Sequence, residues 1–416
     1  MRTRVLVVGG LLAVAVAIAA ISLAPGSTVS ASPSPTAASS EATAASSAPT
    51  ASPSEAASQT PALPPPTTTT SPGDLASLVH PLVASWRPSG PLLLIERSDA
   101  PGATLLAVPL DGGAAIPLVA LPSPVQLGYD LRDDGSVLAV ALAINANTAR
   151  IAIWDLASGT TRWLTEEEPG VMQSTPVWSA DGSLLYYAAH ASAGEAGLVD
   201  LGIFRVRGDG TQKTRVRGPD QNGAQLRGLT PDGRGLVWDR IRAGGAVEVL
   251  DLPSGTNHSF DETTAAALVS WRRAQPRALV IVGGCCAGRP GGSLALWNDT
   301  TGSSTMVLGI RSTPPIAVTS AAWEPGGGRF AAAVVDRASA SNFGSLFIYD
   351  ADGRQLAAVA ATDGAQQVIW LPMGLVFTRA SGARGTAIVL ASVTGGTEAT
   401  LYTDPGSILI RSVVAP

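Results

Sequence analysis

The stretch PVWSADGSLLYYAA, from Pro176 to Ala189, carries the pattern from which the fold can be predicted. It predicts a strand ending at Trp178, a tight turn at Ala180-Asp181-Gly182 and a second strand from Leu184 to Ala188. An Asp-Gly pair tolerates the positive φ that hairpin turns demand, and the flanking residues are aromatic and apolar. Because two isolated strands are only marginally stable in water, this hairpin needs partners elsewhere in the chain.

Relatives of the hairpin recur roughly 40 to 50 residues apart, which is the spacing that a four-stranded propeller blade requires. The copies are SWRPSGPLLLIE (85–96), YDLRDDGSVLAVAL (129–142), VWSADGSLLYYAA (177–189), GLTPDGRGLVWD (228–239), SWRRAQPRALVIVGG (270–284), AWEPGGGRFAAAVV (322–335) and IWLPMGLVFTR (369–379). The position that ends the first strand is occupied in turn by Trp86, Leu131, Trp178, Leu229, Trp271, Trp323 and Trp370.

Each hairpin is followed by a third strand with a Gly-containing turn, and then by a fourth strand. The third strands are LLAVPLDGG (105–113), IAIWDLASG (151–159), LGIFRVRGDG (201–210), VEVLDLPSG (247–255), LALWNDTTG (294–302), LFIYDADG (346–353) and AIVLASVTGG (387–396). Seven such units predict an all-β, seven-bladed β-propeller over residues 75–416. We expect the repeated Trp to fill the wedge between neighbouring blades as a core residue. Helical periodicity is absent from Leu78 onward, which argues against α/β folds.

A further apolar strand, SILIRSVV (407–414), follows the seventh unit. It leaves two arrangements open. The strand either pairs beside the first blade and fastens the ring, which avoids an open sheet edge, or it completes the last blade.

The first 24 residues predict a signal peptide or a signal-anchor transmembrane helix. Arg2 and Arg4 precede an apolar run from Val5 to Ala24 that is about long enough to span a bilayer. Val29-Ser30-Ala31 offers a cleavage site. In either case the arginines stay in the cytoplasm and the rest is extracytoplasmic, membrane-anchored if uncleaved and secreted if cleaved. Residues 25–74, rich in Ser, Thr, Ala and Pro, predict a disordered linker because they have little apolar surface to bury.

The unit W-S-x-D-G-x-x-L-x-Y at Trp178 to Tyr187, followed by an apolar strand, Asp and Ser-Gly, resembles the WD40-like PD40 repeat of TolB-type propellers. The resemblance covers about residues 79–403. It is looser where Leu131 and Leu229 replace Trp, and where the Asp-Gly turn is missing after Trp271 and Trp370. It implies an extracytoplasmic binding or scaffolding propeller. The separate N-terminal α/β domain of TolB has no counterpart here, so its periplasmic partners are not carried over.

Catalytic patterns are sparse. His80, His190 and His258 are each isolated in the sequence, and we expect no metal site at them. Without a G-x-S-x-G stretch, the prolyl oligopeptidase arrangement of a propeller capping an α/β-hydrolase is not expected. We interpret Glu166-Glu167-Glu168 as a solvated loop rather than an acid–base pair, and Arg207-Gly208-Asp209 as a turn rather than an adhesion motif.

The cysteines, Cys285 and Cys286, are adjacent in GGCCAGRPGG. Neighbouring Cα atoms lie about 3.8 Å apart, whereas disulfides prefer roughly 4.4–6.8 Å, so a vicinal bond would be strained. Exported thiols nevertheless tend to oxidise. A vicinal disulfide, a pair of buried thiols and intermolecular pairing all remain open.

Four glutamines lie four or five residues before the repeated Trp or Leu position, where the chain enters an inner strand. They are Gln126, Gln173, Gln225 and Gln366, with Asp130 near the first of them. One hypothesis is that these side chains line a polar funnel at one mouth of the central channel and bind a neutral polar ligand. The alternative is that short polar residues simply suit a loop-to-strand junction.

The net charge of −5 and the low charged fraction of 14% argue against nucleic-acid binding, which calls for a basic stripe. The sequence therefore predicts a non-catalytic binding module of the cell envelope with no cofactor. Its expected partner is an envelope protein or a glycan, with membrane contact through the N-terminal helix if that helix is uncleaved. Two alternatives are an enzyme (a lyase, cyclase or glycan hydrolase) with its site in the central funnel, and an envelope-assembly scaffold.

Overall fold

The computed structural model describes the part of the chain that follows the predicted linker, with gaps. The described residues are 75, 78, 80–99, 102–121, 126–192, 198–221, 223–240, 246–260, 266–272, 277–283, 292–309, 316–336, 344–359, 362–381, 385–393 and 398–414. The predicted leader (1–24) and linker (25–74) lie outside them. Among the described residues, no helix is long and apolar enough to cross a bilayer.

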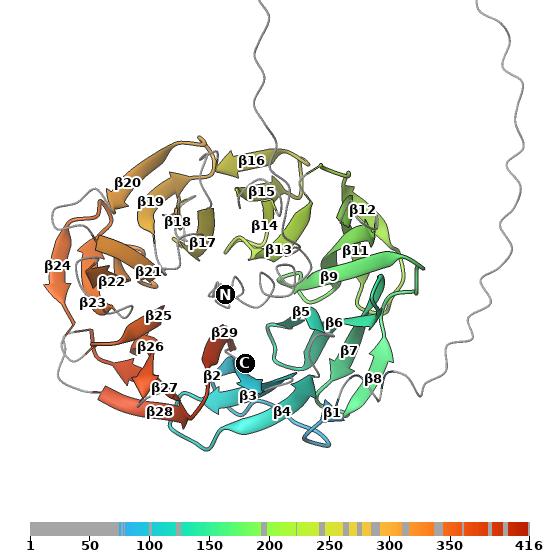
Figure 1. Ribbon diagram of the computed structural model, residues 1–416, viewed down its shortest axis with the longest axis horizontal. Coiled ribbons are helices and arrows are strands. Elements are labelled where there is room, and N and C mark those ends of the chain that lie inside the picture. Colours follow the sequence, from blue (N-terminus) through green and yellow to red (C-terminus); the bar gives the residue numbers. More distant parts are fainter. Residues whose placement is uncertain are drawn as a thin grey trace, which may run out of the picture.

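The described part is an all-β propeller. Its sheets radiate from the centre of a ring, with strands such as β13, β17, β21 and β25 nearest the centre and β16, β20, β24 and β28 at the periphery (Figure 1). Consecutive strands pair antiparallel, because the short turns between them return the chain along its own edge. The alternating apolar residues predicted from the repeats thereby face a neighbouring sheet.

Four sheets each contain four consecutive strands. The first comprises β13 (Ala224–Leu229), β14 (Gly235–Arg240), β15 (Val247–Asp251) and β16 (Asn257–Phe260). The second comprises β17 (Ala266–Trp271), β18 (Arg277–Val282), β19 (Ser293–Asn298) and β20 (Ser304–Leu308). The third comprises β21 (Ile316–Trp323), β22 (Arg329–Asp336), β23 (Ser345–Asp350) and β24 (Gln355–Ala358). The fourth comprises β25 (Ala365–Leu371), β26 (Gly374–Ser381), β27 (Gly385–Ala391) and β28 (Glu398–Asp404).

An eight-stranded sheet contains two antiparallel runs of four strands. One run is β5 (Gln126–Leu131), β6 (Val137–Asn145), β7 (Thr148–Asp155) and β8 (Thr160–Trp163). The other is β9 (Val171–Trp178), β10 (Leu184–Ser192), β11 (Leu198–Arg207) and β12 (Thr214–Arg217). A single parallel pair, Ala149 with Met172, joins β7 to β9 and so links the two runs.

The remaining sheet closes the ring. From its outer to its inner edge it consists of β1 (His80–Pro81), β4 (Ile116–Leu121), β3 (Gly102–Pro109), β2 (Leu92–Asp99) and β29 (Ile408–Val414). The C-terminal strand pairs antiparallel with β2, from Leu92 opposite Val414 to Arg97 opposite Ile408. This confirms the fastening role that was one of the two arrangements open from the sequence.

The prediction that Trp86 ends an inner strand is wrong. Trp86 lies outside any strand, half-buried, with its backbone N–H donating to the Leu156 carbonyl at 2.6 Å. The inner position of this sheet is taken by β29, so Val414 stands opposite Leu92 just as Trp178 stands opposite Leu185 in β10. The residues around Trp86 resemble the hairpin unit, but the inner strand of this sheet comes from the far end of the chain.

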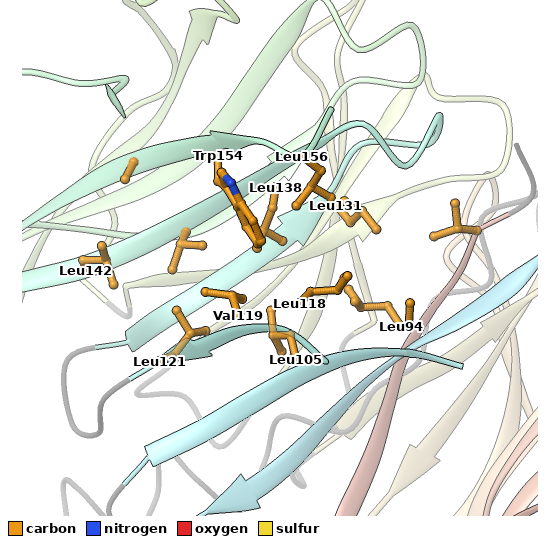
Figure 2. Packing of buried hydrophobic residues seen from close by; sticks show 14 of the residues in the cluster. Leu94, Leu105, Leu118, Val119, Leu121, Leu131, Leu138, Leu142, Trp154 and Leu156 are labelled. Carbon is orange, nitrogen blue, oxygen red and sulfur yellow. The ribbon is translucent and has the colours of Figure 1, made fainter. Parts of the chain in front are cut away.

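Apolar clusters fill the space between adjacent sheets. Figure 2 shows one in which Leu105, Leu118 and Val119 of β3 and β4 face Leu138 and Trp154 of β6 and β7. The repeated Trp position has the expected core role: Trp178, Trp271, Trp323 and Trp370 are at most 9% exposed and pack against the preceding sheet. Leu131 and Leu229 do the same. Truncating such a ring to Ala costs roughly 3–5 kcal/mol, so these wedges hold neighbouring sheets together.

Candidate binding site

Asp130, predicted to line a funnel, ties the two four-stranded runs of the eight-stranded sheet. Its Oδ2 accepts a hydrogen bond from the Trp178 backbone N–H at 2.7 Å, which joins inner strand β5 to inner strand β9. Ser270 of β17 accepts from the Trp323 backbone N–H at 3.1 Å in the same way. A side chain on one inner strand thus satisfies a backbone donor that the next sheet leaves unpaired.

The predicted glutamines are placed at the starts of inner strands, but they do not form one group. Gln173 is 0% exposed, and its Nε2 donates to the Glu166 carbonyl at 3.1 Å, so its side chain is not on an open channel wall. The Oε1 atom of Gln225 accepts from Arg227 at 3.2 Å. Gln366 is half-buried and its carbonyl accepts from the Thr319 hydroxyl at 3.2 Å. The side chain of Gln126 lies outside the described residues.

Gln367, which follows the predicted Gln366, contacts the strand that closes the ring. Gln367 accepts a hydrogen bond at its Oε1 from the Ile410 backbone N–H of β29 at 3.0 Å. It therefore helps to hold the C-terminal strand in the ring. No described hydrogen bond joins any of the four predicted glutamines to another, and their binding role stays a prediction.

The other residues singled out from the sequence are dispersed. Cys285 and Cys286 lie outside the described residues. His80 is exposed on β1, whereas the buried His190 has its Nδ1 3.7 Å from Asp200. Within the described part of the chain, no group of three or more His, Cys, Asp or Glu side chains is arranged to hold a metal ion.

The two motif segments also have local partners. Glu166-Glu167-Glu168 lies on the loop between β8 and β9, where Glu168 pairs with Lys213 and Glu167 lies 4.0 Å from Arg150. Gly208 and Asp209 form the turn between β11 and β12, as expected. The Gly210 N–H closes this turn on the Arg207 carbonyl at 2.9 Å.

A cavity of about 430 Å³, partly open to solvent, lies between the β13–β16 and β17–β20 sheets. Four segments build it: the turn from Thr230 to Gly235, the β15–β16 turn with Asp251 and His258, the end of β17, and the β19–β20 turn. The side chains that matter most for its chemistry are Thr230, Asp232, Asp251, His258, Trp271 and Asp299. Below, this cavity is called the β13–β20 pocket.

The aromatic wall of the β13–β20 pocket is the wedge residue Trp271. It is 9% exposed and packs at a tilted angle against Trp297, with ring centroids 6.1 Å apart. Its indole Nε1 is buried and has no hydrogen-bond partner among the described residues.

Three carboxylates surround this wall. Burial raises the pKa of the Asp299 carboxyl above its usual range and outweighs the opposing effect of His258. Hydrogen bonds from Ser254 lower the pKa of Asp251. Asp232 accepts from the Thr230 hydroxyl at 2.6 Å and from the Arg234 N–H at 3.0 Å. Among the described residues, none of the three carboxylates forms an ion pair.

Sequence reasoning missed this pocket because its residues come from separate turns. His258 at the start of β16 and Asp299 in the β19–β20 turn are about one repeat apart and lie at the last hairpins of adjacent sheets, so the propeller geometry brings them together. Trp271 was interpreted as core alone, whereas it is both buried and a cavity wall. Pairing turn residues that occupy matching places in successive repeats is the sequence signal that could have found the site.

No protein-family model matches the chain, and no curated protein matches its sequence. Solved structures do match. A prolyl endopeptidase aligns with a TM-score of 0.54 and 15% identity over 80% of this chain and 50% of its own. A puromycin hydrolase aligns with a TM-score of 0.54 and 19% identity over 81% of this chain and 57% of its own.

A structure of TolB from Acinetobacter baumannii aligns with a TM-score of 0.41 and 19% identity over 64% of this chain and 62% of its own. The chain thus spans little more than half the length of the enzymes that it matches. At these identities the likeness to the two enzymes shows the fold alone, and that fold is a β-propeller.

Proposed function

We propose that this protein is a seven-bladed propeller that acts outside the cytoplasm as a non-catalytic binding module. In this proposal a partner from the cell envelope, a protein or a glycan, docks at the β13–β20 pocket. The single observation that carries the proposal is the pocket itself, since hydrogen-bond acceptors surround an aromatic wall in a cavity of about 430 Å³. Concave sites with an aromatic lining and a few placed polar groups are typical of ligand binding.

The blade count follows from treating the two runs of the eight-stranded sheet as separate blades. The single parallel pair between β7 and β9 is a weak connection compared with the antiparallel ladders inside each run. Seven apolar clusters among the described residues, each shared by two neighbouring four-stranded units or by a unit and the closing sheet, support the same count. A closed ring of seven gives the pocket a rigid frame.

The extracytoplasmic location rests on the amino-acid sequence. The apolar run from Val5 to Ala24 with its preceding arginines favours export, and residues 25–74 would separate the propeller from the membrane surface. The resemblance to PD40 repeats agrees with this location. Membrane anchoring and secretion after cleavage both fit a binding module, and they differ in how far it acts from the cell.

The test is capture of the partner in the cell by the full-length chain. A tagged chain is cross-linked in its own host, purified and examined for attached proteins and glycans by mass spectrometry. The wild type is compared with Asp299→Ala and with Asp111→Ala, a turn aspartate of the closing sheet outside the pocket. We expect one partner to be captured by the wild type and by Asp111→Ala but lost with Asp299→Ala. Equal capture by all three would remove the pocket from the proposal.

A further inference from the structure

Three of the four wedge tryptophans on inner strands are covered by an arginine from the four-stranded unit that precedes them in the ring. The guanidinium carbon of Arg132 lies 5.9 Å from the Trp178 ring centroid. Arg272 lies 5.3 Å from Trp323, and Arg329 lies 5.5 Å from Trp370. Trp271 is the fourth wedge tryptophan. Among the described residues, no cation lies over its ring.

One position in the repeat distinguishes Trp271 from Trp178 and Trp323, whereas Trp370 is covered from another position, by Arg329 at the start of β22. Arg132 and Arg272 each follow directly after the wedge residue of their own sheet, and from there they reach the tryptophan of the next sheet. In the sheet before Trp271 that position is Thr230, whose short side chain closes its own turn by accepting from the Gly235 N–H at 2.8 Å. Thr230 is too short to cover Trp271, and the β13–β20 pocket lies at this place.

Elsewhere in the chain, an arginine already lies between a wedge tryptophan and an aspartate, and we call this arrangement the template. Arg132 lies over Trp178 and at the same time binds Asp134 with two hydrogen bonds, Nε to Oδ1 at 3.0 Å and Nη2 to Oδ2 at 2.9 Å. Asp134 stands three residues after the wedge position, and Asp232 is the residue at the same place in the pocket. The pocket thus has the tryptophan and the aspartate of the template but lacks the arginine.

We propose that the β13–β20 pocket binds the guanidinium group of an arginine side chain presented by the partner. The bound group would stack on Trp271 and donate to Asp232 and Asp299, as Arg132 does to its own neighbours. This assignment rests on the proposed binding function and names its ligand class. A guanidinium fits better than an ammonium, because its planar fork both stacks on an indole and pairs with carboxylates in two directions.

The charge of the lining favours a cation. Three aspartates face two arginines and His258; of the arginines, Arg272 lies over Trp323 and Arg234 is exposed at the rim. A partly desolvated carboxylate such as Asp299 gains more from a cation than one in bulk water does. The partner's arginine would thereby relieve the cost of burying Asp299.

The experiment is calorimetric titration of the full-length protein with N-acetyl-arginine N-methylamide. The neutral isostere N-acetyl-citrulline N-methylamide tests the charge, and free arginine tests whether a peptide-like backbone matters. We expect saturable binding of the blocked arginine, and binding of the citrulline compound weaker by about tenfold or more, the equivalent of one cation–π contact and one charge-assisted pair. Binding of free arginine equal to or tighter than that of the blocked form would overturn the assignment to a peptide side chain.

Four variants locate the site. Thr230→Arg should supply the missing arginine and abolish binding, because the new side chain would occupy the pocket from within. Trp271→Leu, a residue that this position holds in two other sheets, should weaken binding about tenfold, as should Asp299→Asn. Asp111→Asn should leave it unchanged. Circular dichroism and a thermal melt of each variant show whether it is folded, and Asp299→Asn alters a turn rather than the core.

The outcomes separate the two proposals. If the arginine compound does not bind, or binds no better than the citrulline compound, the guanidinium assignment is overturned. In that case, capture of a cellular partner that Thr230→Arg still blocks would leave the binding function standing. If Thr230→Arg changes neither the titration nor the capture, both proposals fail.

Discussion

At the scale of single residues, turn aspartates shape this propeller through their side chains. Asp181 accepts from the Ser183 N–H at 3.0 Å and from the Ser179 hydroxyl at 2.6 Å. Only the glycine that follows it takes a positive φ, 70° at Gly182. The two residues of the Asp-Gly pair therefore have different roles. Glycine provides the left-handed backbone, and the carboxylate satisfies the donors of the turn.

Asp134 should make stability depend on pH. Burial alone would raise its pKa, but hydrogen bonds from Arg132 and Ser136 lower it from 3.8 to about 2. Because the folded-state pKa is depressed, the ionised carboxylate stabilises the fold above about pH 4, and this contribution is lost as the pH falls towards 2. In Asp134→Asn we expect a smaller loss of melting temperature between pH 4 and pH 2 than in the wild type.

The matched control for this change is Asp111→Asn, since Asp111 accepts a single backbone hydrogen bond, from Gly113 at 3.1 Å. Its melting temperature should follow that of the wild type across the same pH range. A wild-type slope in Asp134→Asn would show that the stabilising charge lies elsewhere.

A buried ion pair joins the two ends of the ring. Arg411 of β29 donates from Nε to Glu96 of β2 at 2.8 Å, and the Tyr129 hydroxyl donates to the same carboxylate at 2.6 Å. Removing the arginine leaves a 4% exposed carboxylate without its cation. We expect Arg411→Met to lower the free energy of unfolding by about 3 kcal/mol, measured by urea denaturation.

The double variant Glu96→Gln/Arg411→Met is the informative comparison. It removes the buried charge together with its partner, so it should be more stable than Arg411→Met alone. If the two variants unfold at the same urea concentration, the pair is not a coupled unit.

Asp299 should make the proposed arginine binding depend on pH. Burial raises the pKa of this carboxyl, so it becomes protonated at a higher pH than an ordinary aspartate as the solution is acidified. The affinity for the blocked arginine should fall as the pH is lowered through that raised value, and the fall should be shallower in Asp299→Asn. Calorimetry at a series of pH values checks this. Parallel profiles for both proteins would contradict a role for the Asp299 charge.

At the scale of elements, the inner strands carry the coupling between sheets. Besides the wedge rings, side chains tie consecutive inner strands, as when Thr175 accepts from the Leu226 N–H and Ser320 from the Val368 N–H, both at 3.1 Å. The strand β29 belongs to this series through Gln367. Its loss would remove an inner strand and leave the β2 edge unpaired.

Deleting residues 407–416 should therefore open the ring. The exposed edge of β2 offers unpaired backbone groups to other chains, so we expect a lower melting temperature and self-association in light scattering. A separate peptide of residues 405–416 should restore the wild-type melt, and the same peptide with Ile408 and Ile410 changed to Asp should not, because both side chains are buried. A truncated chain that melts like the wild type would show that β29 is dispensable.

The repeat pattern predicted most strands, because a period of two residues with a Gly-containing turn survives in every unit. The predicted third strand at 201–210, for example, corresponds to β11 at Leu198–Arg207. The prediction at Trp86 was wrong because the inner strand of that sheet is β29, from the far end of the chain. Local sequence does not show which distant strand pairs with β2. The tie made by Gln367 rather than Gln366 shows the related limit, since one residue of register decides which face a side chain takes.

At the scale of the whole molecule, the ring could be predicted from the sequence, but the pocket between the β13–β16 and β17–β20 sheets could not. Thr230 lies in the pocket at the repeat position that Arg132 and Arg272 hold elsewhere, and this difference matters only once the neighbouring sheet brings Trp271 to it. The proposed binding function depends on a position that departs from the repeat, and a search for recurring residues does not detect such positions.

The proposed location leads to a further expectation for the intact protein. The full-length chain should fractionate with membranes if the leader is retained, or with the extracellular medium if it is cut. In both cases the propeller should react with a label that does not cross the membrane. Intact mass of the purified chain distinguishes the two forms. Recovery of the unlabelled protein from the cytosol would contradict the export proposed from Arg2, Arg4 and the apolar run.

The position of β1 bears on how such a tethered ring would respond to pulling. The strand is held at the outermost edge of its sheet by two paired positions, His80 with Ala120 and Pro81 with Val119, while the closing strand β29 lies at the opposite, inner edge. Tension arriving along the preceding segment would load the buried Leu75 first, then these two positions, and after them the hydrogen bonds from the Leu82 and Trp86 N–H groups to the Leu118 and Leu156 carbonyls. The outer edge of this sheet would therefore carry the load before the closing strand β29 did.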